Sequence, residues 1–491
     1  MITRKFTIIL ILFLILLSAC SPAVQPTMIL RPQSEDDGDQ DLPEMTAFPT
    51  RPVYQPGELV DYEAQTGDTL VALAARFNTT VEEIRDVNTF IPPDATTMPP
   101  GMPMQIPIYT RALWGTPFQI LSDAAFVNGP DAISFDTQVF INEQNGWLRT
   151  YQAWAFDGNR SGADIIDYVA ISYSISPKLL LALLEYQGGG LSQSLLDARD
   201  EEEILGLSSD YWTGVYLQLS YAANILNDGY YRWREGDLLE FDIADGSLVR
   251  PDPWQNAATV SLQYFFSQVL SASEFHQAIG DDGFSKTYQQ YFGDPWTINA
   301  HIPGTLTQPV LELPYDYVDN NKWAFTGGPH TGWGNLAPWA ALDFAPPSSV
   351  TGCMVSSVPT TAVADGVVVR DGEGLLVLDL DGDGDERTGW VVLYLHIARD
   401  GRVPIGTQVV TGDPLGFPSC EGGSSTGTHI HLARKFNGEW MVADSVVPFV
   451  LSGWRAVSGD EPYAGFLVKG DDIIIANTNP DNLSIIPVND E

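Results

Sequence analysis

Residues 427–432, in the C-terminal third of the chain, read Gly-Thr-His-Ile-His-Leu. Its alternating pattern predicts a β-strand. Because side chains two residues apart on a strand project from the same face, His429 and His431 are predicted to point into one cavity. Neutral imidazoles are ordinary ligands of zinc, so the strand is a candidate wall of a metal site.

Further candidate ligands lie upstream of this strand. His330 and Asp343 stand in the stretch GGPHTGWGNLAPWAALDFAPP, and His396 ends the alternating run VVLYLH. Short alternating runs rich in Val and Gly, from residue 310 onward, predict an antiparallel β-sheet. Imidazoles and one carboxylate around an open position for water are typical of a catalytic zinc site.

These motifs resemble the lysostaphin-type, or LytM-like, zinc metallopeptidases, whose pattern is a His, an Asp, a Tyr-x-His strand and Gly-x-His-x-His. The resemblance implies that His330, Asp343 and His431 bind one Zn²⁺ ion. It also implies that His429 is the general base and that His396 stabilises the oxyanion, beside the substrate carbonyl. The implied reaction is hydrolysis of a peptide bond by a zinc-activated water.

The segment between the first two ligands departs from the family pattern. Twelve residues, Thr331 to Leu342, separate His330 from Asp343, where the family has a shorter segment. This insert must loop out if both side chains are to reach one metal ion. An alternative is that the fold is kept and the metal lost, as in LytM-like proteins that only activate other cell-wall hydrolases.

An acidic segment, Asp379–Asp385, lies between two predicted strands. Its alternating carboxylates resemble the start of a Ca²⁺-binding loop, but the twelfth position is Trp390 instead of Glu. A Ca²⁺ site and a solvated acidic hairpin are both open interpretations.

The first twenty residues predict export. Arg4 and Lys5 precede an apolar run of 14 residues, which suits the core of a signal peptide. The run ends in Leu-Ser-Ala-Cys, which resembles a bacterial lipobox with Cys20 as the lipidated residue. We expect a lipoprotein signal peptide over 1–19 and a lipid-anchored flexible linker over 20–58; the alternative is an uncleaved anchor helix. The predicted location is the extracytoplasmic face of the cell membrane.

Two cysteines remain, Cys353 and Cys420. In an oxidising compartment such a pair is a disulfide candidate, and two buried free thiols are the alternative.

Residues 59–109 predict a small module of two strands around two helices. Its motifs GDTL, ARF, VEEI and a closing IPIY resemble the LysM family. The resemblance implies a βααβ fold that binds N-acetylglucosamine chains, as in peptidoglycan. Gly67, Asp68 and Thr69 are the predicted sugar contacts, because Gly and short polar residues let backbone groups approach a ligand. The alternative is a spacer without a ligand.

Residues 110–309 predict a mostly helical domain. The helix that begins at Ser176-Pro177 is apolar all round and therefore buried. It resembles the helix before the catalytic Glu of lysozyme-like lytic transglycosylases, but Gln187 stands where that acid belongs. Because Gln cannot protonate a glycosidic oxygen, we expect either a degenerate lysozyme-like domain or an unrelated helical spacer.

The whole chain of 491 residues predicts several domains, ending in a zinc metallopeptidase-like β domain over 310–455 and a C-terminal extension over 456–491. The formal net charge of −39 argues against nucleic-acid binding, which needs basic surfaces. The sequence therefore predicts a membrane-anchored extracytoplasmic endopeptidase that cleaves the peptide cross-links of peptidoglycan. The alternative is a non-catalytic peptidoglycan-binding scaffold or activator.

Overall fold

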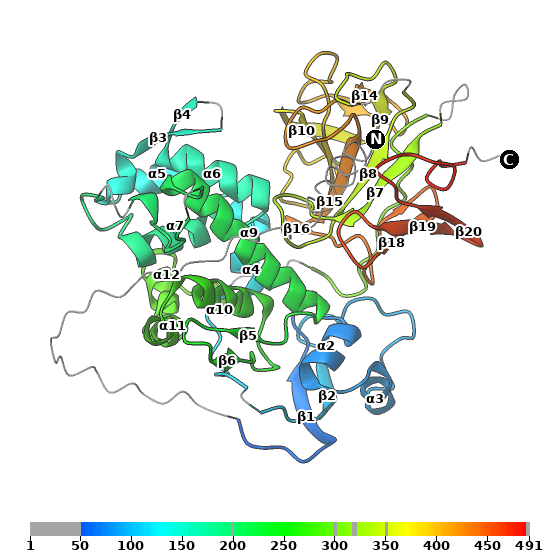
Figure 1. Ribbon diagram of the computed structural model, residues 1–491. Coiled ribbons are helices and arrows are strands. Elements are labelled where there is room, and N and C mark those ends of the chain that lie inside the picture. Colours follow the sequence, from blue (N-terminus) through cyan, green and yellow to red (C-terminus); the bar gives the residue numbers. More distant parts are fainter. Residues whose placement is uncertain are drawn as a thin grey trace, which may run out of the picture.

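The computed structural model describes residues 51–487, apart from 113, 157, 198–200, 210, 298–301, 317–321 and 349–351. The signal peptide, Cys20 and most of the linker predicted over 20–58 lie outside the described residues. Within the described ranges, no helix is long and apolar enough to cross a membrane. Figure 1 shows a small module, a helical domain and a β domain packed together.

The small module has the predicted βααβ order: β1 (Glu58–Glu63), α2 (Leu70–Phe77), α3 (Val81–Val87) and β2 (Pro103–Ile108), with β1 antiparallel to β2. Local sequence explains both helix starts. Thr69 caps α2, and Thr80 caps α3 in a reciprocal capping box with Glu83. Phe77 and Ile84 are fully buried in the module's own core.

The middle domain is mostly helical, as predicted. Its helices are α4 (Asp123–Phe126), α5 (Thr137–Asn142), α6 (Gly162–Tyr173), α7 (Pro177–Gly188), α9 (Gly214–Glu235), α10 (Ala257–Val269), α11 (Ala272–Ala278) and α12 (Phe284–Phe292). Two small hairpins join them, β3 (Gln152–Ala155) with β4 (Gly158–Ser161) and β5 (Phe241–Asp242) with β6 (Leu248–Val249). The long helix α9 packs against α6 and α10, and α7 is buried along residues 179–184.

The β domain is built on an antiparallel sheet with the order β13-β10-β11-β12-β15-β8-β7, and β16 pairs with β15. These strands are β7 (Ala324–His330), β8 (Ala341–Ala345), β10 (Gly366–Gly372), β11 (Leu375–Asp379), β12 (Trp390–Leu395), β13 (Gln408–Val409), β15 (Ile430–Phe436) and β16 (Glu439–Trp440). A separate pair joins β9 (Thr360–Thr361) to β14 (Pro414–Gly416). The sheet confirms the predicted antiparallel fold and places β15 in its interior, between β12 and β8.

The predicted boundary between residues 455 and 456 does not hold, because it falls inside strand β18 (Trp454–Ser458). This strand forms a second sheet with β17 (Val450–Leu451), β19 (Gly465–Lys469) and β20 (Asp472–Ile475). Trp454 and Leu467 belong to the same hydrophobic core as the main sheet. The C-terminal residues are therefore part of the β domain instead of an extension to it.

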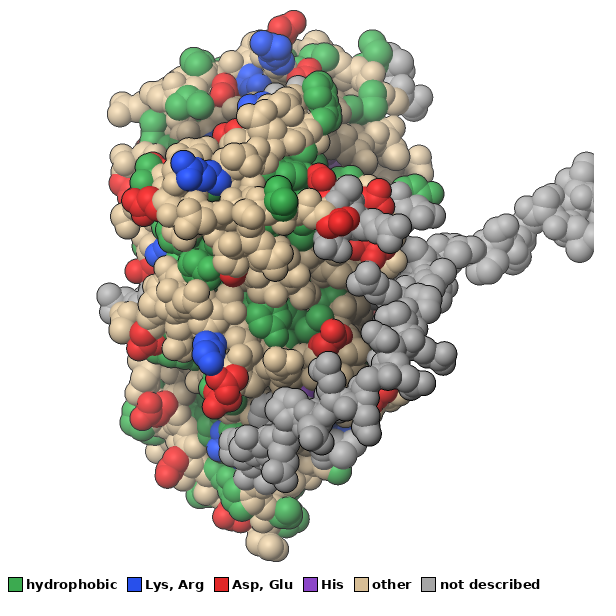
Figure 2. All heavy atoms as spheres, turned by 90° about the vertical axis from the view of Figure 1, so that its left-hand side faces the viewer, with side chains coloured by type: hydrophobic (Ala, Val, Ile, Leu, Met, Phe, Trp, Pro, Cys, Tyr) green, Lys and Arg blue, Asp and Glu red, His purple; other side chains and the backbone are tan. Residues whose placement is uncertain are grey.

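Buried polar contacts fix the helical domain against the β domain, which lies beside it in Figure 1. Arg234, near the end of α9, is 3.1 Å from a carboxylate oxygen of Asp123 and 3.6 Å from one of Glu439 in β16. The backbone N–H of Trp440 donates to the hydroxyl of Tyr231 at 2.8 Å. On the face shown in Figure 2, acidic side chains are scattered among neutral ones and basic side chains are fewer.

Candidate metal centre

Three strands bring the predicted ligands together. His330 ends β7, and Asp343 in β8 is the register partner of His431 in β15. Nε2 of His330 lies 3.0 Å from Nδ1 of His431, and Oδ1 of Asp343 lies 3.3 and 3.4 Å from these two nitrogens. All three side chains are buried. The insert between the first two ligands loops out, as the sequence requires.

The donor set fits a zinc ion. Ligands at zinc bond lengths in a tetrahedral arrangement lie about 3.3 Å apart, close to the distances between these three atoms. Oδ1 of Asp343 is buried and has no hydrogen-bond partner. Although burial raises the pKa of Asp343, the imidazoles of His330 and His429 hold it well below its ordinary value, so the carboxyl is ionised.

The hydrogen bonds of the outer ring nitrogens show which nitrogen of His330 and of His431 faces the site. Nδ1 of His330 lies 2.8 Å from the carbonyl of Gly328, and Nε2 of His431 lies 3.2 Å from that of Gly332. Each outer nitrogen therefore carries the proton and donates it, so a neutral ring turns a lone pair toward the other. Two lone pairs 3.0 Å apart repel unless a cation lies between them, which favours metal binding.

His396 and His429 lie together at the edge of this cluster, with ring centroids 4.5 Å apart. Nε2 of His429 is 3.7 Å from Oδ2 of Asp343. Nδ1 of His396 is held by the carbonyl of Glu421 at 2.9 Å, and Nδ1 of His429 by that of Gly427 at 2.8 Å. Burial, and then the repulsion that two protonated rings would feel beside His429, lower the pKa of His396 to about 4, so its ring is neutral at neutral pH.

The backbone at His396 is strained. Its φ of 70° lies in the left-handed region, which residues other than Gly rarely adopt. The N–H of Ser419 donates to the His396 carbonyl at 2.6 Å and helps to hold this conformation. Strain of this kind persists where the surrounding structure enforces a functional geometry.

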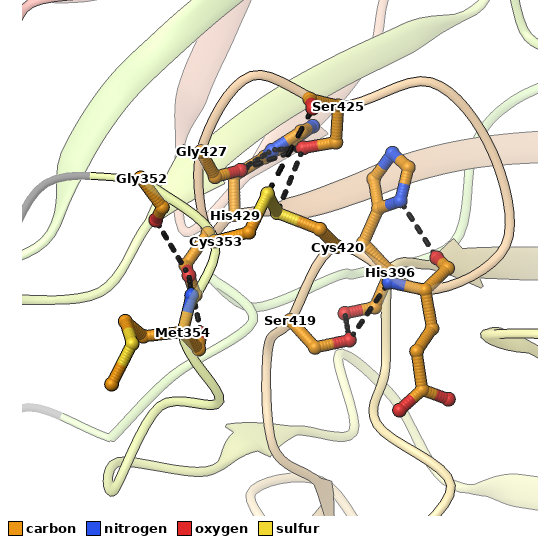
Figure 3. The surroundings of a disulfide bond; sticks show 11 residues. Gly352, Cys353, Met354, His396, Ser419, Cys420, Ser425, Gly427 and His429 are labelled. Atoms are coloured by element: carbon orange, nitrogen blue, oxygen red, sulfur yellow. Dashed lines mark hydrogen bonds between the residues drawn. A yellow bond between two sulfur atoms is a disulfide. The ribbon is translucent and has the colours of Figure 1, made fainter.

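The predicted disulfide between Cys353 and Cys420 is present, with the two Cα atoms 5.6 Å apart. Figure 3 shows it beside His429 and His396. The hydroxyl of Ser425 donates to the sulfur of Cys420 at 3.4 Å and lies 3.3 Å from Nδ1 of His429. The disulfide thus fastens the loop that precedes β15.

Sequence reasoning missed Tyr463. Its ring stacks on His330, with centroids 4.1 Å apart and planes at 23°. The residue lies between β18 and β19, in the segment predicted as a separate extension, and about half of its surface is exposed. No motif around Tyr463 could have signalled this contact, because it depends on the second sheet packing against β7.

The insert contacts the helical domain. The N–H of Asn335 donates to Oδ1 of Asn224 at 2.9 Å, and the N–H of Ala337 donates to Oδ1 of Asp228 at 3.3 Å. Both acceptors lie on α9. Since Gly332 in the same insert accepts from His431, the insert connects α9 to a ligand of the candidate metal centre.

The acidic loop Asp379–Asp385 satisfies its own polar groups. The carboxylate of Asp379 accepts from the N–H groups of Asp381 and Gly384 at 3.2 and 2.9 Å, and Asp385 pairs with Arg387 at 2.6 Å. Ligand atoms of Asp379, Asp381 and Asp383 lie within 4.8 Å of one another. The hydrogen bonds account for the shape of the loop without a cation, and Ca²⁺ binding here gains no support.

The predicted sugar contacts differ in exposure, since Asp68 is buried whereas Gly67 and Thr69 are partly exposed. Asp68 is buried and accepts from the hydroxyl of Tyr62 at 2.6 Å and from Arg76 at 2.9 Å. The hydroxyl of Thr69 caps α2 by accepting a hydrogen bond from the N–H of Ala72. Gly67 faces the guanidinium of Arg234, so close that a Cβ there would lie 1.9 Å from Nη1. The prediction is wrong for Asp68, because its carboxylate binds the module together instead of facing solvent.

Glu185 in the helical domain is occupied by structural contacts. Its carboxylate accepts from the N–H groups of Leu191 and Ser192 at 2.8 and 3.1 Å and from the hydroxyl of Tyr291 at 3.0 Å. Gln187 is 3.5 Å from the carbonyl of Leu205. These contacts explain both side chains as structural, and they do not indicate a general acid at the end of the helix.

The comparisons with known proteins agree with this organisation. Residues 62–107 match the LysM domain family, and residues 119–305 match the family described as LasA, N-terminal domain. The second match gives no support to the lysozyme-like interpretation of the helical region. Protease LasA of Pseudomonas aeruginosa (strain UCBPP-PA14) is 25% identical over 340 residues, which cover 65% of this chain and 74% of the relative.

Two solved structures also share features with the chain. The M23 metalloprotease pseudoalterin from the deep sea is 22% identical, covers 35% of this chain and 96% of its own, and has a TM-score of 0.29. The catalytic domain of lysostaphin from Staphylococcus simulans is 22% identical over 27% of this chain and 95% of its own, with a TM-score of 0.20. The family matches and the LasA similarity carry the assignment. The chain thus combines a LysM domain, a domain similar to the N-terminal domain of LasA and a C-terminal β domain, and 65% of it is similar to Protease LasA.

Proposed function

We propose that the protein is a zinc endopeptidase that cleaves peptide cross-links of peptidoglycan. The observation that carries the proposal is the buried cluster of His330, Asp343 and His431, whose facing nitrogens and unpartnered carboxylate oxygen call for a cation. The similarity to Protease LasA supports peptide hydrolysis. The LysM domain supports a cell-wall substrate.

His330, Asp343 and His431 would hold the zinc ion, which when bound polarises the scissile carbonyl and acidifies a water molecule. His429 and His396 would accept and donate protons during the reaction. Because both keep their N–H on Nδ1, their Nε2 atoms are proton acceptors in the free enzyme. His429, nearer to Asp343, is placed to take the proton of the attacking water.

The role of His396 follows from the same hydrogen bond. A neutral His396 offers Nε2 only as an acceptor, since Glu421 fixes the proton on Nδ1. The oxyanion role expected from the sequence needs an N–H on Nε2. His396 would gain that N–H only if the proton taken from the attacking water passed to it from His429, whose ring lies 4.5 Å away between centroids; it could then donate to the oxyanion and return the proton to the leaving amine.

We also propose that a lipid on Cys20 holds the enzyme on the extracytoplasmic face of the cell membrane. The support is the sequence pattern at residues 1–20. The acidic linker that follows would let the folded domains reach the cell wall.

Incubation of the purified full-length protein with peptidoglycan sacculi tests this function. Release of new amino groups, with a matching loss of cross-linked muropeptides, is expected and should stop when a chelator removes the metal. Release of new reducing ends would indicate glycan cleavage and contradict the proposal. Absence of any new amino group with every peptidoglycan chemotype would favour a non-catalytic scaffold.

A further inference from the structure

We infer that the helical domain supplies one wall of the peptide-binding site, formed by three aromatic side chains on its surface near the metal centre. They are Phe156 in the turn between β3 and β4, Tyr168 in α6 and Tyr216 in α9, and together they are called the aromatic wall. This inference rests on the proposed endopeptidase and names a surface that binds the peptide of its substrate.

The helical domain packs on the sheet face that carries the metal centre. Leu395 in β12 is the register partner of His431, and Ala433 lies two residues further along β15, so all three side chains project from one face. Leu395 and Ala433 share a hydrophobic core with the helices, whereas Tyr394 and Leu432, on the opposite face, belong to the core of the β domain. A peptide that approaches His431 over this face therefore passes beside the helical domain.

The aromatic wall is connected to the loop beside His396. The hydroxyl of Tyr168 donates to the carboxylate of Glu373, in the turn between β10 and β11, at 3.5 Å. The backbone of Glu373 packs so closely on Gly422 that a Cβ on this glycine would overlap the Glu373 carbonyl oxygen. The next residue, Gly423, faces the ring of His396, since a Cβ there would lie 3.6 Å from Cε1. One turn and one loop thus link the wall to the edge of the metal centre.

The helices that carry the wall also contact the insert beside His431. Tyr173 in α6 and Asn224 in α9 both lie against Gly334, where a Cβ would be 3.1 Å from Cε1 of Tyr173 and would overlap Oδ1 of Asn224. Gly332 in the same insert lies 3.2 Å from Nε2 of His431 through its carbonyl oxygen. The two helices are therefore fixed against both loops that border the metal centre.

The three rings of the aromatic wall form one ordered surface. Phe156 and Tyr168 stack with centroids 3.9 Å apart and planes at 18°, and Tyr216 lies 5.6 and 6.0 Å from them. All three side chains are partly exposed. Phe156 has a φ of 41°, which residues other than Gly rarely adopt, so its ring is held on Tyr168 by a strained turn. Ordered aromatic rings that keep part of their area in water are typical of binding surfaces.

The groups of the wall suit a peptide. Ring faces pack against small apolar side chains, and tyrosine hydroxyls exchange hydrogen bonds with peptide groups. The exposed carboxylate of Glu373 adds a negative charge at the edge of the wall. This charge favours a peptide that carries ammonium groups and disfavours an anionic polymer. The geometry therefore assigns the wall to a cross-linked peptide with free ammonium groups.

Calorimetry tests the inference in full-length, zinc-loaded His429→Ala protein, in which slow turnover leaves the ligand intact. The probe is a soluble cross-linked peptide with free ammonium groups and no sugars. Adding Phe156→Gly or Tyr216→Ala should weaken its binding about tenfold, the size of one favourable aromatic contact. Adding Trp154→Ala, which removes a tryptophan that is 75% exposed on β3 and is not part of the wall, should leave the affinity unchanged.

The choice of variants separates binding from folding. Gly adopts a φ of 41° without strain, so Phe156→Gly removes the ring and leaves the turn intact. Tyr216→Phe keeps the ring and should bind the peptide within about threefold of the parent. Equal thermal unfolding and equal zinc content of all variants would show that the domains and the metal centre are preserved.

Unchanged affinity in both Phe156→Gly and Tyr216→Ala would overturn the inference, as would a parent protein that does not bind the peptide. Hydrolysis of the same peptide by protein with His429 intact tests the proposed function separately. There the wall variants should raise KM about tenfold and leave kcat unchanged, because they remove binding and not chemistry. If the protein binds the peptide through the wall but does not hydrolyse it, the proposed endopeptidase fails and the wall stands.

Discussion

The metal centre and the LysM domain differ in how well a sequence motif predicts the side chains that form a functional site. In the β domain, register alone pairs Asp343 with His431 and brings their side chains together. In the LysM domain, the motif folds as expected, but Asp68 is buried and Arg234 of α9 packs against Gly67, which is only partly exposed. Residues that meet through strand pairing are fixed by local pattern, whereas exposure depends on what another domain covers. Four variants test this contrast, and the expected loss decreases from the first to the last.

His431→Ala should abolish both zinc binding and peptidoglycan hydrolysis, because it removes a buried ligand atom from the centre. Metal content and amino-group release measure the two losses. His276→Ala on α11 is the matched control, since it removes a histidine from the helical domain. A His431→Ala protein that keeps one zinc ion would show that the ligand set is wrong.

His429→Ala should keep the zinc ion but lower kcat by roughly 10²- to 10⁴-fold, the usual contribution of a general acid–base group. Its Nε2 approaches Asp343 only at 3.7 Å and does not join the three ligand atoms. Steady-state kinetics with equal metal loading make the measurement. Loss of zinc in this variant would move His429 into the ligand set.

Replacing Cys353 and Cys420 by Ser should lower the free energy of unfolding of the β domain. The bridge spans 67 residues, and the chain-entropy model gives about 4 kcal/mol for such a loop. Denaturant unfolding with and without a reductant measures the change, and the reductant should have no effect on the double variant. Equal stability of both proteins would mean that the loop beside His429 is held without the bridge.

Asn224→Ala combined with Asp228→Ala should weaken zinc affinity roughly tenfold, the lower end of effects seen for groups that support metal ligands. These α9 side chains hold the insert that carries the Gly332 carbonyl to His431. Competition with a chromogenic chelator gives the affinity. Lys286→Ala on α12, whose exposed ammonium pairs with Asp282 in its own helical region, is the control. Unchanged zinc affinity would mean that the contact between α9 and the insert does not support the metal centre.

Sequence patterns predicted the elements but not their burial by other domains. The strand around His431 and the cap at Thr69 follow from residue spacing, and both are present. The role of Tyr463 and the burial of Asp68 were not predictable in this way. The role of Tyr463 depends on a contact between segments far apart in the chain, whose geometry no local pattern encodes, whereas Asp68 is held by Tyr62 and Arg76 of its own module. The boundary placed at residue 455 failed for the same reason, since a strand pairing overrides composition there.

The metal content of the full-length protein decides whether His330, Asp343 and His431 hold a zinc ion that hydrolysis needs. Elemental analysis after purification without added metal should give one zinc ion per chain. Dialysis against a chelator should remove the ion together with peptidoglycan hydrolysis, and added zinc should restore both. Full hydrolysis by protein that holds no metal would contradict the account, as would a bound zinc ion that is still present in His330→Ala, Asp343→Ala and His431→Ala.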